Sequence, residues 1–303
     1  YNKIRSFVKN GKGSTMKFYI LSVEAKFQPD LVKILYPNHN DNYGIEQDFL
    51  RYLQKNKYLV TEDIKSADWH YLPIYWTSWH LNHNYGKEGL VELQESVREF
   101  IVDDDKTFTI CQYDDGPLVD IGKTKIFFGS RKKNKPFDAP LLCRPHRIPI
   151  LKPKKKYLAC FVGRVSTHSI RQEMADLLKQ RADIFLYDGN NGSRFFIRKL
   201  LESYLSLCPR GYGGSSFRFY ESMQLGVVPL LIGDIDTRPF KEFINWDEVS
   251  LYLKSPKNLE ALLETLDRSN LLKMGKKASI FWKRELSYQR WCKYVIKELE
   301  GLN

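Results

Sequence analysis

Several features that mark other classes of protein are scarce in this sequence. Its 303 residues contain no run of about 18 apolar residues, so no membrane-spanning helix is predicted. The five cysteines form no CxxC pair and are odd in number, which disfavours a disulfide framework or a zinc site. There is no low-complexity basic tail and no regular alternation of arginine with aromatic residues. A nucleic-acid partner is therefore not expected.

Basic residues nevertheless outnumber acidic ones. The chain has 48 Lys and Arg against 36 Asp and Glu, a formal net charge of +12. Residues 1–15 hold four basic and no acidic side chains, and we interpret them as a leader or an artificial extension before a natural start at Met16. The remaining net charge of +8 favours an anionic partner, such as the phosphates of a nucleotide.

The N-terminal half alternates predicted strands with predicted helices. Runs rich in β-branched and aromatic residues predict strands, and apolar residues at helical spacing predict helices. The predicted strands span 18–23, 69–76, 108–113 and 124–129, and the predicted helices span 44–56 and 88–103. This alternation is typical of parallel βαβ units.

A proline-rich, basic stretch at 144–156 predicts a linker to a second half of the same kind. There the predicted strands span 157–163, 184–189 and 228–234, with another ending at Cys208-Pro209, and the predicted helices span 169–181, 195–204, 216–226, 256–268 and about 270–299. We therefore predict two domains, 16–150 and 151–282, with about 283–303 joining the first. Ligands of open parallel sheets bind beyond the carboxyl ends of the strands, so the expected site is a cleft between the halves.

The most informative segment is CPRGYGGSSFRFYESMQLGVVPLLIGD, residues 208–234. Its glycines permit close approach of the backbone to a ligand, and Ser215 and Ser216 precede a predicted helix whose N-terminus attracts anions. Arg218 suits phosphate, and Glu221, on the same helix face, can accept hydrogen bonds from a ribose diol. The alternative interpretation is a glycine-rich turn followed by an acid that caps the helix.

This segment, with Pro239-Phe240 and INWD at 244–247, resembles the nucleotide-sugar-binding segment of exostosin-like glycosyltransferases, glycosyltransferase family 47. The resemblance implies an α/β fold of GT-B type, in which two Rossmann-like domains face a central cleft. It implies that Glu221 binds the ribose and that Arg218 contacts the diphosphate. The nucleotide-sugar contacts implied are Gly213, Ser215, Ser216, Arg218, Glu221, Arg164, Arg171 and Arg210. For Arg164, Arg171 and Arg210, the alternative is that they are ordinary surface arginines.

The resemblance also implies the reaction. An inverting enzyme of this family would transfer xylose, galactose, glucuronic acid or arabinose from a UDP-sugar to a hydroxyl of an oligosaccharide or glycoprotein glycan. We expect no cofactor and no metal, with the UDP-sugar as co-substrate. We also expect a soluble protein without membrane insertion, in the cytoplasm (the host cytoplasm if the protein is viral), or in the Golgi lumen if the chain is a truncated piece.

An inverting transfer needs a base that takes the proton of the attacking hydroxyl. Asp114 and Asp115, in the turn YDDGP after a predicted strand, are the first candidates, and Glu46 is the reserve. The alternative is that Asp-Asp-Gly-Pro simply forms a good turn. Gly86-Lys87-Glu88 stands where many plant-type members have Gly-Arg-Asp-His, a departure that affects acceptor recognition.

Aromatic side chains near the predicted strand 69–76 offer an acceptor site. Trp76, Trp79 and His80 follow the apolar part of that strand, and rings there can stack on the apolar faces of sugars. Packing in the core is the alternative. His80 and His83 have no third ligand nearby in the sequence, so they do not predict a metal site.

Two competing functions remain open at this point. A metal-dependent transferase of the single-domain GT-A type would use Asp234 and Asp236 as a metal-binding Asp-x-Asp pair, with Asp103-Asp104-Asp105 as a poorer match. A non-catalytic glycan-binding protein on a transferase fold would use the same aromatic and basic residues. The arginine-rich phosphate loop favours a transferase that needs no metal.

Overall fold

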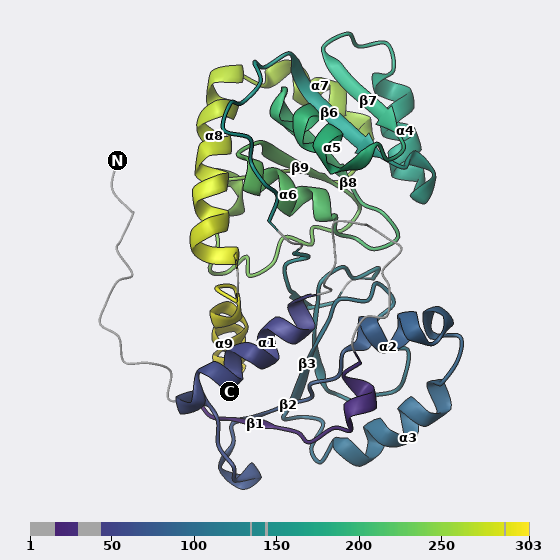
Figure 1. The fold of residues 1–303 in the computed structure, drawn as a ribbon, viewed down its shortest axis with the longest axis vertical. Coiled ribbons are helices and arrows are strands. Elements are labelled where there is room, and N and C mark those ends of the chain that lie inside the picture. The colour runs from purple at the N-terminus through teal and green to yellow at the C-terminus, as the bar shows by residue number, and fades with distance from the viewer. Residues whose placement is uncertain (1–15, 30–43, 134, 143–144, 288, 303) are drawn as a thin grey trace.

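The structure, a computed structural model, describes residues 16–29, 44–133, 135–142, 145–287 and 289–302 (Figure 1). The first fifteen residues, interpreted above as a leader or an extension, lie outside the described residues. The described residues form two parallel sheets of five strands each, one in each half of the chain. This arrangement confirms the predicted α/β fold with two halves. None of the described helices combines the length and the apolar character needed to cross a bilayer.

The first sheet keeps its strands in chain order: β1 (Phe18–Ile20), β2 (Trp69–Tyr71), β3 (Thr107–Cys111), β4 (Lys125–Phe128) and β5 (Phe137–Asp138). Its helices are α1 (Gly44–Lys55), α2 (Trp76–Asn82) and α3 (Leu90–Phe100). Successive residues of a strand point to opposite faces. Phe108 and Ile110 therefore pack with α1 on one face, whereas Cys111 packs with α2 and α3 on the other.

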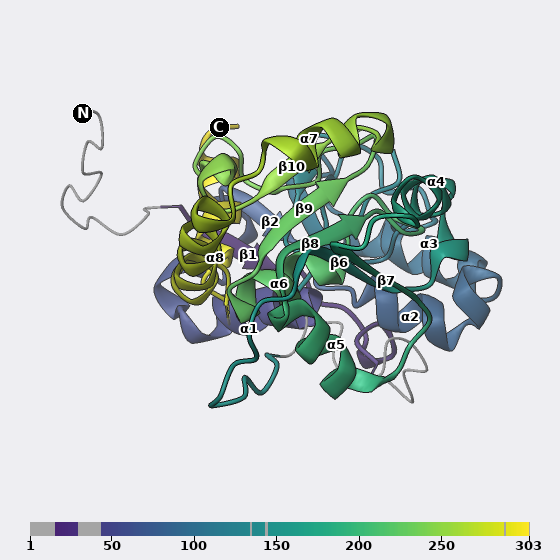
Figure 2. The same cartoon turned by 90° about the horizontal axis from the view of Figure 1, so that it is seen from above.

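The second sheet has the order β10, β9, β8, β6, β7, and Figure 2 shows these strands following one another across the view. Helices α4 and α7 cover one face, and α5 and α6 cover the other. The order reverses between β6 and β8, and such a switch point is where open α/β sheets bind ligands. The elements are β6 (Tyr157–Gly163), α4 (Ser169–Leu178), β7 (Ile184–Asp188), α5 (Gly192–Leu201), β8 (Ser203–Pro209), α6 (Phe217–Leu225), β9 (Val228–Ile232), β10 (Leu251–Leu253) and α7 (Leu259–Thr265).

The last helices connect the two halves. Helix α8 (Arg268–Phe281) runs along the second half, a π-helical turn spans Trp282–Leu286, and α9 (Cys292–Glu300) lies beside α1 in the first half (Figure 1). The ring centroids of Phe49 in α1 and Trp291 before α9 are 6.1 Å apart. One hydrophobic cluster extends from Phe49 through α9 to Phe219 in α6, so the two halves share a core.

Three short stretches differ from the predicted elements. Strands β5 and β10 were not predicted, because runs of two and three residues give no periodic signal. The strand predicted over 69–76 ends at Tyr71, and helix α2 begins at Trp76. Pro73 lies between them and has no N–H for a sheet ladder, which explains the early end of the strand.

The predicted acceptor platform of Trp76, Trp79 and His80 is wrong. These side chains are 0%, 2% and 0% exposed. Nε1 of Trp76 donates to the hydroxyl of Thr109 at 2.9 Å, and the centroid of the Trp79 ring lies 4.7 Å from that of Phe27. Burial lowers the pKa of His80 to about 4, so this imidazole is a neutral core group. Because α2 packs these rings onto the sheet, none of them presents a face to a glycan.

Glu46, the reserve candidate for the base, also lies in the core. It is 0% exposed and accepts hydrogen bonds from the N–H of Gln112 at 2.8 Å and the hydroxyl of Thr77 at 3.0 Å. Burial raises the pKa of this carboxyl to about 8, although these hydrogen bonds oppose the shift. Glu46 therefore ties α1 to α2 and β3, away from the cavity described below, and its prediction as a base is wrong.

The raised pKa of Glu46 predicts a pH dependence of stability. The unfolded chain ionises this carboxyl near pH 4.5 and the folded chain near pH 8, so the folded state binds an extra proton between these values. The free energy of unfolding should therefore fall as the pH rises from 5 to 8, with a contribution from Glu46 of about 2–4 kcal/mol. Glu46→Gln cannot ionise and should flatten this fall in urea titrations. Glu95→Gln, exposed on α3, is the control, and equal slopes in wild type and Glu46→Gln would contradict the prediction.

Candidate functional site

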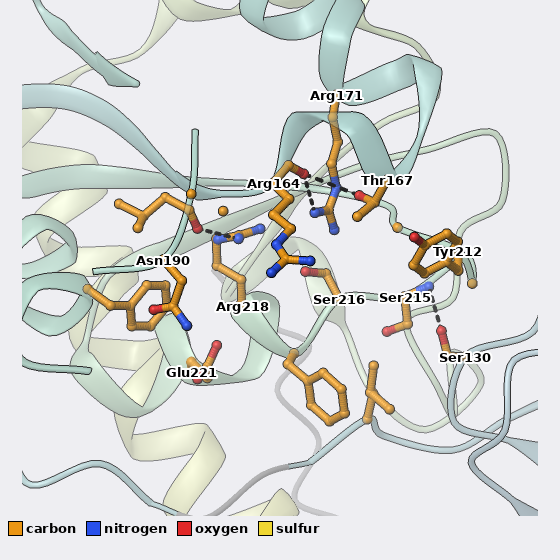
Figure 3. Close-up of a pocket in the computed structure, with 18 of the residues that line it drawn as sticks. Ser130, Arg164, Thr167, Arg171, Asn190, Tyr212, Ser215, Ser216, Arg218 and Glu221 are labelled. Carbon is orange, nitrogen blue, oxygen red and sulfur yellow. Dashed lines mark hydrogen bonds between the residues drawn. The ribbon is translucent and has the colours of Figure 1, made fainter. Parts of the chain in front are cut away.

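A cavity of about 330 Å³ lies at the carboxyl ends of β6 and β8, at the switch point of the second sheet (Figure 3). Loops of the first half close one side of it, so the cavity lies between the two halves. Its lining from the first half is Asp114, Ser130 and Leu141. Its lining from the second half is Val162, Gly163, Arg164, Thr167, Arg171, Gly189, Asn190, Gly192, Ser193, Phe196, Gly211, Tyr212, Gly213, Ser215, Ser216, Phe217, Arg218 and Glu221.

The glycine-rich loop between β8 and α6 is pressed against the first half. A Cβ atom at Gly213 would collide with Ser130 and Asp114. The N–H of Gly214 donates to the carbonyl of Arg131 at 2.9 Å, and a Cβ atom there would lie only 2.7 Å from the same oxygen. Both positions therefore need glycine because the backbone of the other half is too close for a side chain.

Helix α6 brings hydrogen-bond donors to the cavity. Ser215 and Ser216 line it at the N-terminus of the helix, where backbone N–H groups have no partner within the helix. Arg218, in the first turn, is 8% exposed; it donates to the carbonyl of Val162, and its guanidinium lies 4.5 Å from the centroid of the Phe161 ring. Its Nε and Nη1 find no hydrogen-bond partner among the described residues. Two buried donors of a permanent cation without partners indicate an anionic ligand.

The other three arginines predicted as ligand contacts differ in position. Arg171 is buried and donates to the backbone carbonyls of Arg164 and Arg210, at 2.9 Å each, so it holds two loops in place. Arg164 lines the cavity, and Figure 3 shows its side chain in the middle of the site. Arg210 is not part of the lining, because its guanidinium forms an ion pair with Asp234. The structure therefore does not bring Arg210 to the cavity as predicted.

Glu221 lines the cavity one turn after Arg218 and is 2% exposed. Its Oε1 lies 2.8 Å from Nε2 of His146, whose side chain is 5% exposed. His146 belongs to the segment that joins the two halves, and its backbone N–H donates to Oε1 of Gln224 at 3.0 Å. His146 was not predicted as a site residue, because the prolines and basic residues around it indicated only a linker.

Of the two adjacent acids predicted as the base, only Asp114 reaches the cavity. Burial raises the pKa of Asp114 to about 6, although a hydrogen bond from Ser130 and the positive charges of Lys132 and Arg210 oppose the shift. Asp115 is exposed and forms an ion pair with Lys132 at 2.6 Å. Asp114 therefore remains the candidate base, and the structure does not bring Asp115 to the site.

Several lining side chains were not singled out from the sequence, among them Thr167, Asn190, Phe196 and Tyr212. Thr167 follows β6, Asn190 follows β7, and Phe196 lies in α5. Tyr212 is in the glycine-rich loop and is 64% exposed. The Asn-Asn-Gly turn at 190–192 follows the carboxyl end of a predicted strand, and that position could have indicated this part of the site.

The acids proposed for a metal-dependent GT-A enzyme do not form a metal site. Asp234 pairs with Arg210, and Asp236 accepts from Nε and Nη2 of Arg238 at 3.0 Å each. Neither acid lines the cavity, and the two sheets differ from a single-domain fold, so the GT-A alternative is wrong. Within the described part of the chain, the acids close enough to share an ion are Asp103, Asp104 and Asp105, which are not in the cavity lining.

Two parallel α/β halves with a cationic cavity between them are typical of the class of two-domain glycosyltransferases with a GT-B type fold. Comparison with known proteins gives a matching family model for part of the chain. Residues 128–268, from the end of β4 to the start of α8, match the family model described as Exostosin GT47 domain. This segment of the chain is therefore similar to the exostosin domain of glycosyltransferase family GT47.

Curated proteins with related sequences carry names of the same kind. The chain is 33% identical over 113 residues to a probable glucuronoxylan glucuronosyltransferase of Arabidopsis thaliana, covering 36% of this chain and 23% of that protein. It is 26% identical over 149 residues to a probable glucuronosyltransferase of Oryza sativa subsp. japonica, covering 46% and 34%. It is 24% identical over 155 residues to Exostosin-1 of Drosophila melanogaster, covering 43% and 20%. The chain thus spans between a fifth and about a third of these relatives.

Gly163→Ala should displace Arg218, because a Cβ atom at position 163 would collide with its guanidinium. If Arg218 binds a phosphate, the affinity for a nucleoside diphosphate should fall by about 1.5–3 kcal/mol, the usual value of a hydrogen bond to a charged group. Isothermal titration calorimetry measures this change. Gly301→Ala is the control, because a Cβ atom there meets its nearest neighbour at an ordinary 3.5 Å. Wild-type affinity in Gly163→Ala would place the phosphate contact elsewhere.

Proposed function

We propose that this protein is an inverting glycosyltransferase that transfers a sugar from a UDP-sugar to a hydroxyl of a glycan. The observation that carries the proposal is the pairing of Arg218 and Glu221 on one face of α6, at the wall of a cavity closed by the other half. Arg218 offers two buried donors that await an anion, and Glu221 offers a buried acceptor three residues further on. A nucleoside diphosphate has acceptor phosphates and a donor ribose diol at comparable spacing.

The diphosphate would lie at the N-terminus of α6. Ser215 and Ser216 line this end of the helix, and Arg218 and Arg164 contribute positive charge. These groups would stabilise the negative charge that develops on the leaving UDP, the role that a metal ion has in other transferases. We therefore propose that the reaction is metal-independent, so that activity persists in excess chelator.

Asp114 is proposed as the base. It lines the cavity from the half opposite to Arg218 and Glu221, where an acceptor would enter. With a pKa of about 6 it is mostly ionised at pH 7 and still basic enough to take a proton. The acceptor oxygen attacks the anomeric carbon as the bond from that carbon to the diphosphate oxygen breaks. The hydroxyl proton passes to Asp114, UDP leaves with the bonding electron pair, and the configuration inverts.

Tyr212 is the proposed aromatic contact for the acceptor. Its side chain is largely exposed and lies in the loop beside Gly213, which packs against Asp114. A ring at the rim of the cavity can stack on the apolar face of a sugar, which the buried Trp76 and Trp79 cannot do. Among the four sugars expected for the donor, glucuronic acid is the first to test, because two of the relatives are named glucuronosyltransferases.

The first experiment is a thermal-shift panel of UDP-, GDP- and CMP-sugars, because a ligand that binds only the folded state raises its unfolding temperature. UDP-glucuronic acid, UDP-xylose, UDP-galactose and UDP-arabinose form the UDP arm. UDP release with the best donor and a glycan acceptor then separates an enzyme from a protein that only binds glycans. A panel in which GDP- or CMP-sugars give the larger shift would contradict the UDP assignment.

Arg218→Lys should weaken UDP binding, because a point charge cannot replace a planar group that offers two donors to phosphate. Glu221→Ala should weaken it as well, by about 1–3 kcal/mol, through loss of the ribose hydrogen bonds. Calorimetric titration with UDP gives both values. Arg51→Lys, exposed on α1, is the matched control and should bind UDP as wild type does. Normal UDP affinity in a folded Glu221→Ala protein would refute the assignment of Glu221.

Asp114→Asn should lower turnover by about 10²–10⁴-fold while UDP affinity stays close to wild type. In wild type, kcat/KM should rise with pH through about 6 and then level off, because the base works only when Asp114 has lost its proton. The variant should lose that rise. Asp115→Asn is the control, since its carboxylate is exposed and paired with Lys132. If Asp114→Asn kept more than about half of wild-type turnover, the base would lie elsewhere.

A further inference from the structure

The segment between the two halves contacts helix α6 at two points. Nε2 of His146 lies 2.8 Å from Oε1 of Glu221, and the backbone N–H of His146 donates to Oε1 of Gln224 at 3.0 Å. Glu221 and Gln224 are three residues apart, so both contacts fall on the same face of α6. The side chains of His146 and Glu221 are 5% and 3% exposed, and solvent does not compete for this contact.

These contacts restrict the carboxylate of Glu221. A glutamate side chain has three rotatable bonds, and a ligand must fix them all before two oxygens can face a diol. A hydrogen bond from a fixed ring N–H selects one orientation in advance. The ring is itself fixed, because its backbone is bonded to Gln224 and its ring centroid lies 5.8 Å from that of Phe196. The bond also sets the tautomer, since Nε2 must carry the proton to donate it.

His146 does not itself line the cavity, whereas Glu221 does. An effect of His146 on a ligand can therefore pass through Glu221, through the ring of Phe196 in the cavity lining, or through the position of the linking segment. The neighbour Arg147 is exposed and offers a comparison from the same segment. Substitutions of His146 and of Arg147 can therefore be compared to distinguish a specific effect on Glu221 from a general effect of the linker.

We propose that His146 is a positioning residue that holds the Glu221 carboxylate in the orientation that recognises the ribose hydroxyls of the donor. The segment that joins the halves is then part of the donor site and not only a connection. The proposal rests on the proposed function, because it takes a nucleoside diphosphate as the ligand. It predicts that removing the His146 side chain weakens only the binding of the ribose and leaves the diphosphate contacts of Arg218 intact.

The experiment compares UDP with 2′,3′-dideoxy-UDP, which keeps the base and both phosphates but lacks the diol. Wild type should bind UDP about tenfold or more tightly than the dideoxy compound, as expected for hydrogen bonds to a charged acceptor. His146→Ala should reduce that ratio to about threefold or less, mainly through weaker binding of UDP. With a saturating donor, kcat should stay within about threefold of wild type, because the base and the diphosphate contacts are unchanged.

Two further variants guard against a merely structural effect. His146→Gln places an amide N–H near the position of Nε2 and should restore most of the discrimination, whereas His146→Met fills the volume without a donor and should not. Arg147→Ala should behave as wild type. These three comparisons remain informative if His146→Ala fails to fold, as judged by circular dichroism and thermal melting.

The outcomes separate the two proposals. If wild type binds both nucleotides equally, the ribose role of Glu221 is wrong, and the donor assignment in the proposed function fails with it. If wild type discriminates but His146→Met discriminates equally well, the donor site stands and the positioning role of His146 is wrong. A fall in kcat with an unchanged ratio of affinities would also overturn the positioning role, because it would place His146 in the chemical step.

Discussion

A buried arginine, Arg218, has two donor atoms that find no partner among the residues that the structure describes, and the rest of the site depends on this constraint. Leaving the charge of an arginine partly unpaired in the interior costs folding free energy. The surroundings of Arg218 reduce that cost only in part, through the carbonyl of Val162 and the ring face of Phe161. Gly163 is part of the same arrangement, because any side chain there would occupy the place of the guanidinium. The anionic ligand proposed above would accept hydrogen bonds from these two donor atoms.

The relative position of the two halves is fixed by packing as well as by the linker. A continuous hydrophobic cluster crosses from α1 through α9 to α6, and the glycine-rich loop touches the opposite half at Gly213 and Gly214. On that opposite half, Arg131 is fixed by a buried two-point ion pair with Asp138, with Nε–Oδ1 2.6 Å and Nη2–Oδ2 2.9 Å. The position of Asp114 relative to α6 therefore follows from close backbone contacts. In this way the distance and orientation between a proton acceptor on one half and a leaving-group site on the other can be maintained.

What could be predicted from the sequence depends on how local each feature is. The parallel fold was predictable because alternating strands and helices have distinct periods, and the structure confirms it. Gly213, Ser216, Arg218 and Glu221 were predicted as one group because the loop and helix that carry them are contiguous. His146 lies 75 positions from Glu221, and no local pattern joins them. The burial of Trp76 and Trp79 depends on where α2 packs, which aromatic content alone does not indicate.

Glu46 and Asp114, two of the carboxyls with raised pKa values, show why geometry has to be considered before titration. Burial raises the pKa of Glu46 to about 8, which is a larger change than the rise of the Asp114 pKa to about 6. On the pKa alone, Glu46 would be the stronger candidate for a base near neutral pH. Its oxygens, however, accept hydrogen bonds from Thr77 and Gln112 inside the first half and reach no cavity. Asp114 has the smaller shift but faces the space that a donor and an acceptor would share. A perturbed pKa thus reports burial in both residues, and only the position of Asp114 turns it into a property that a reaction can use.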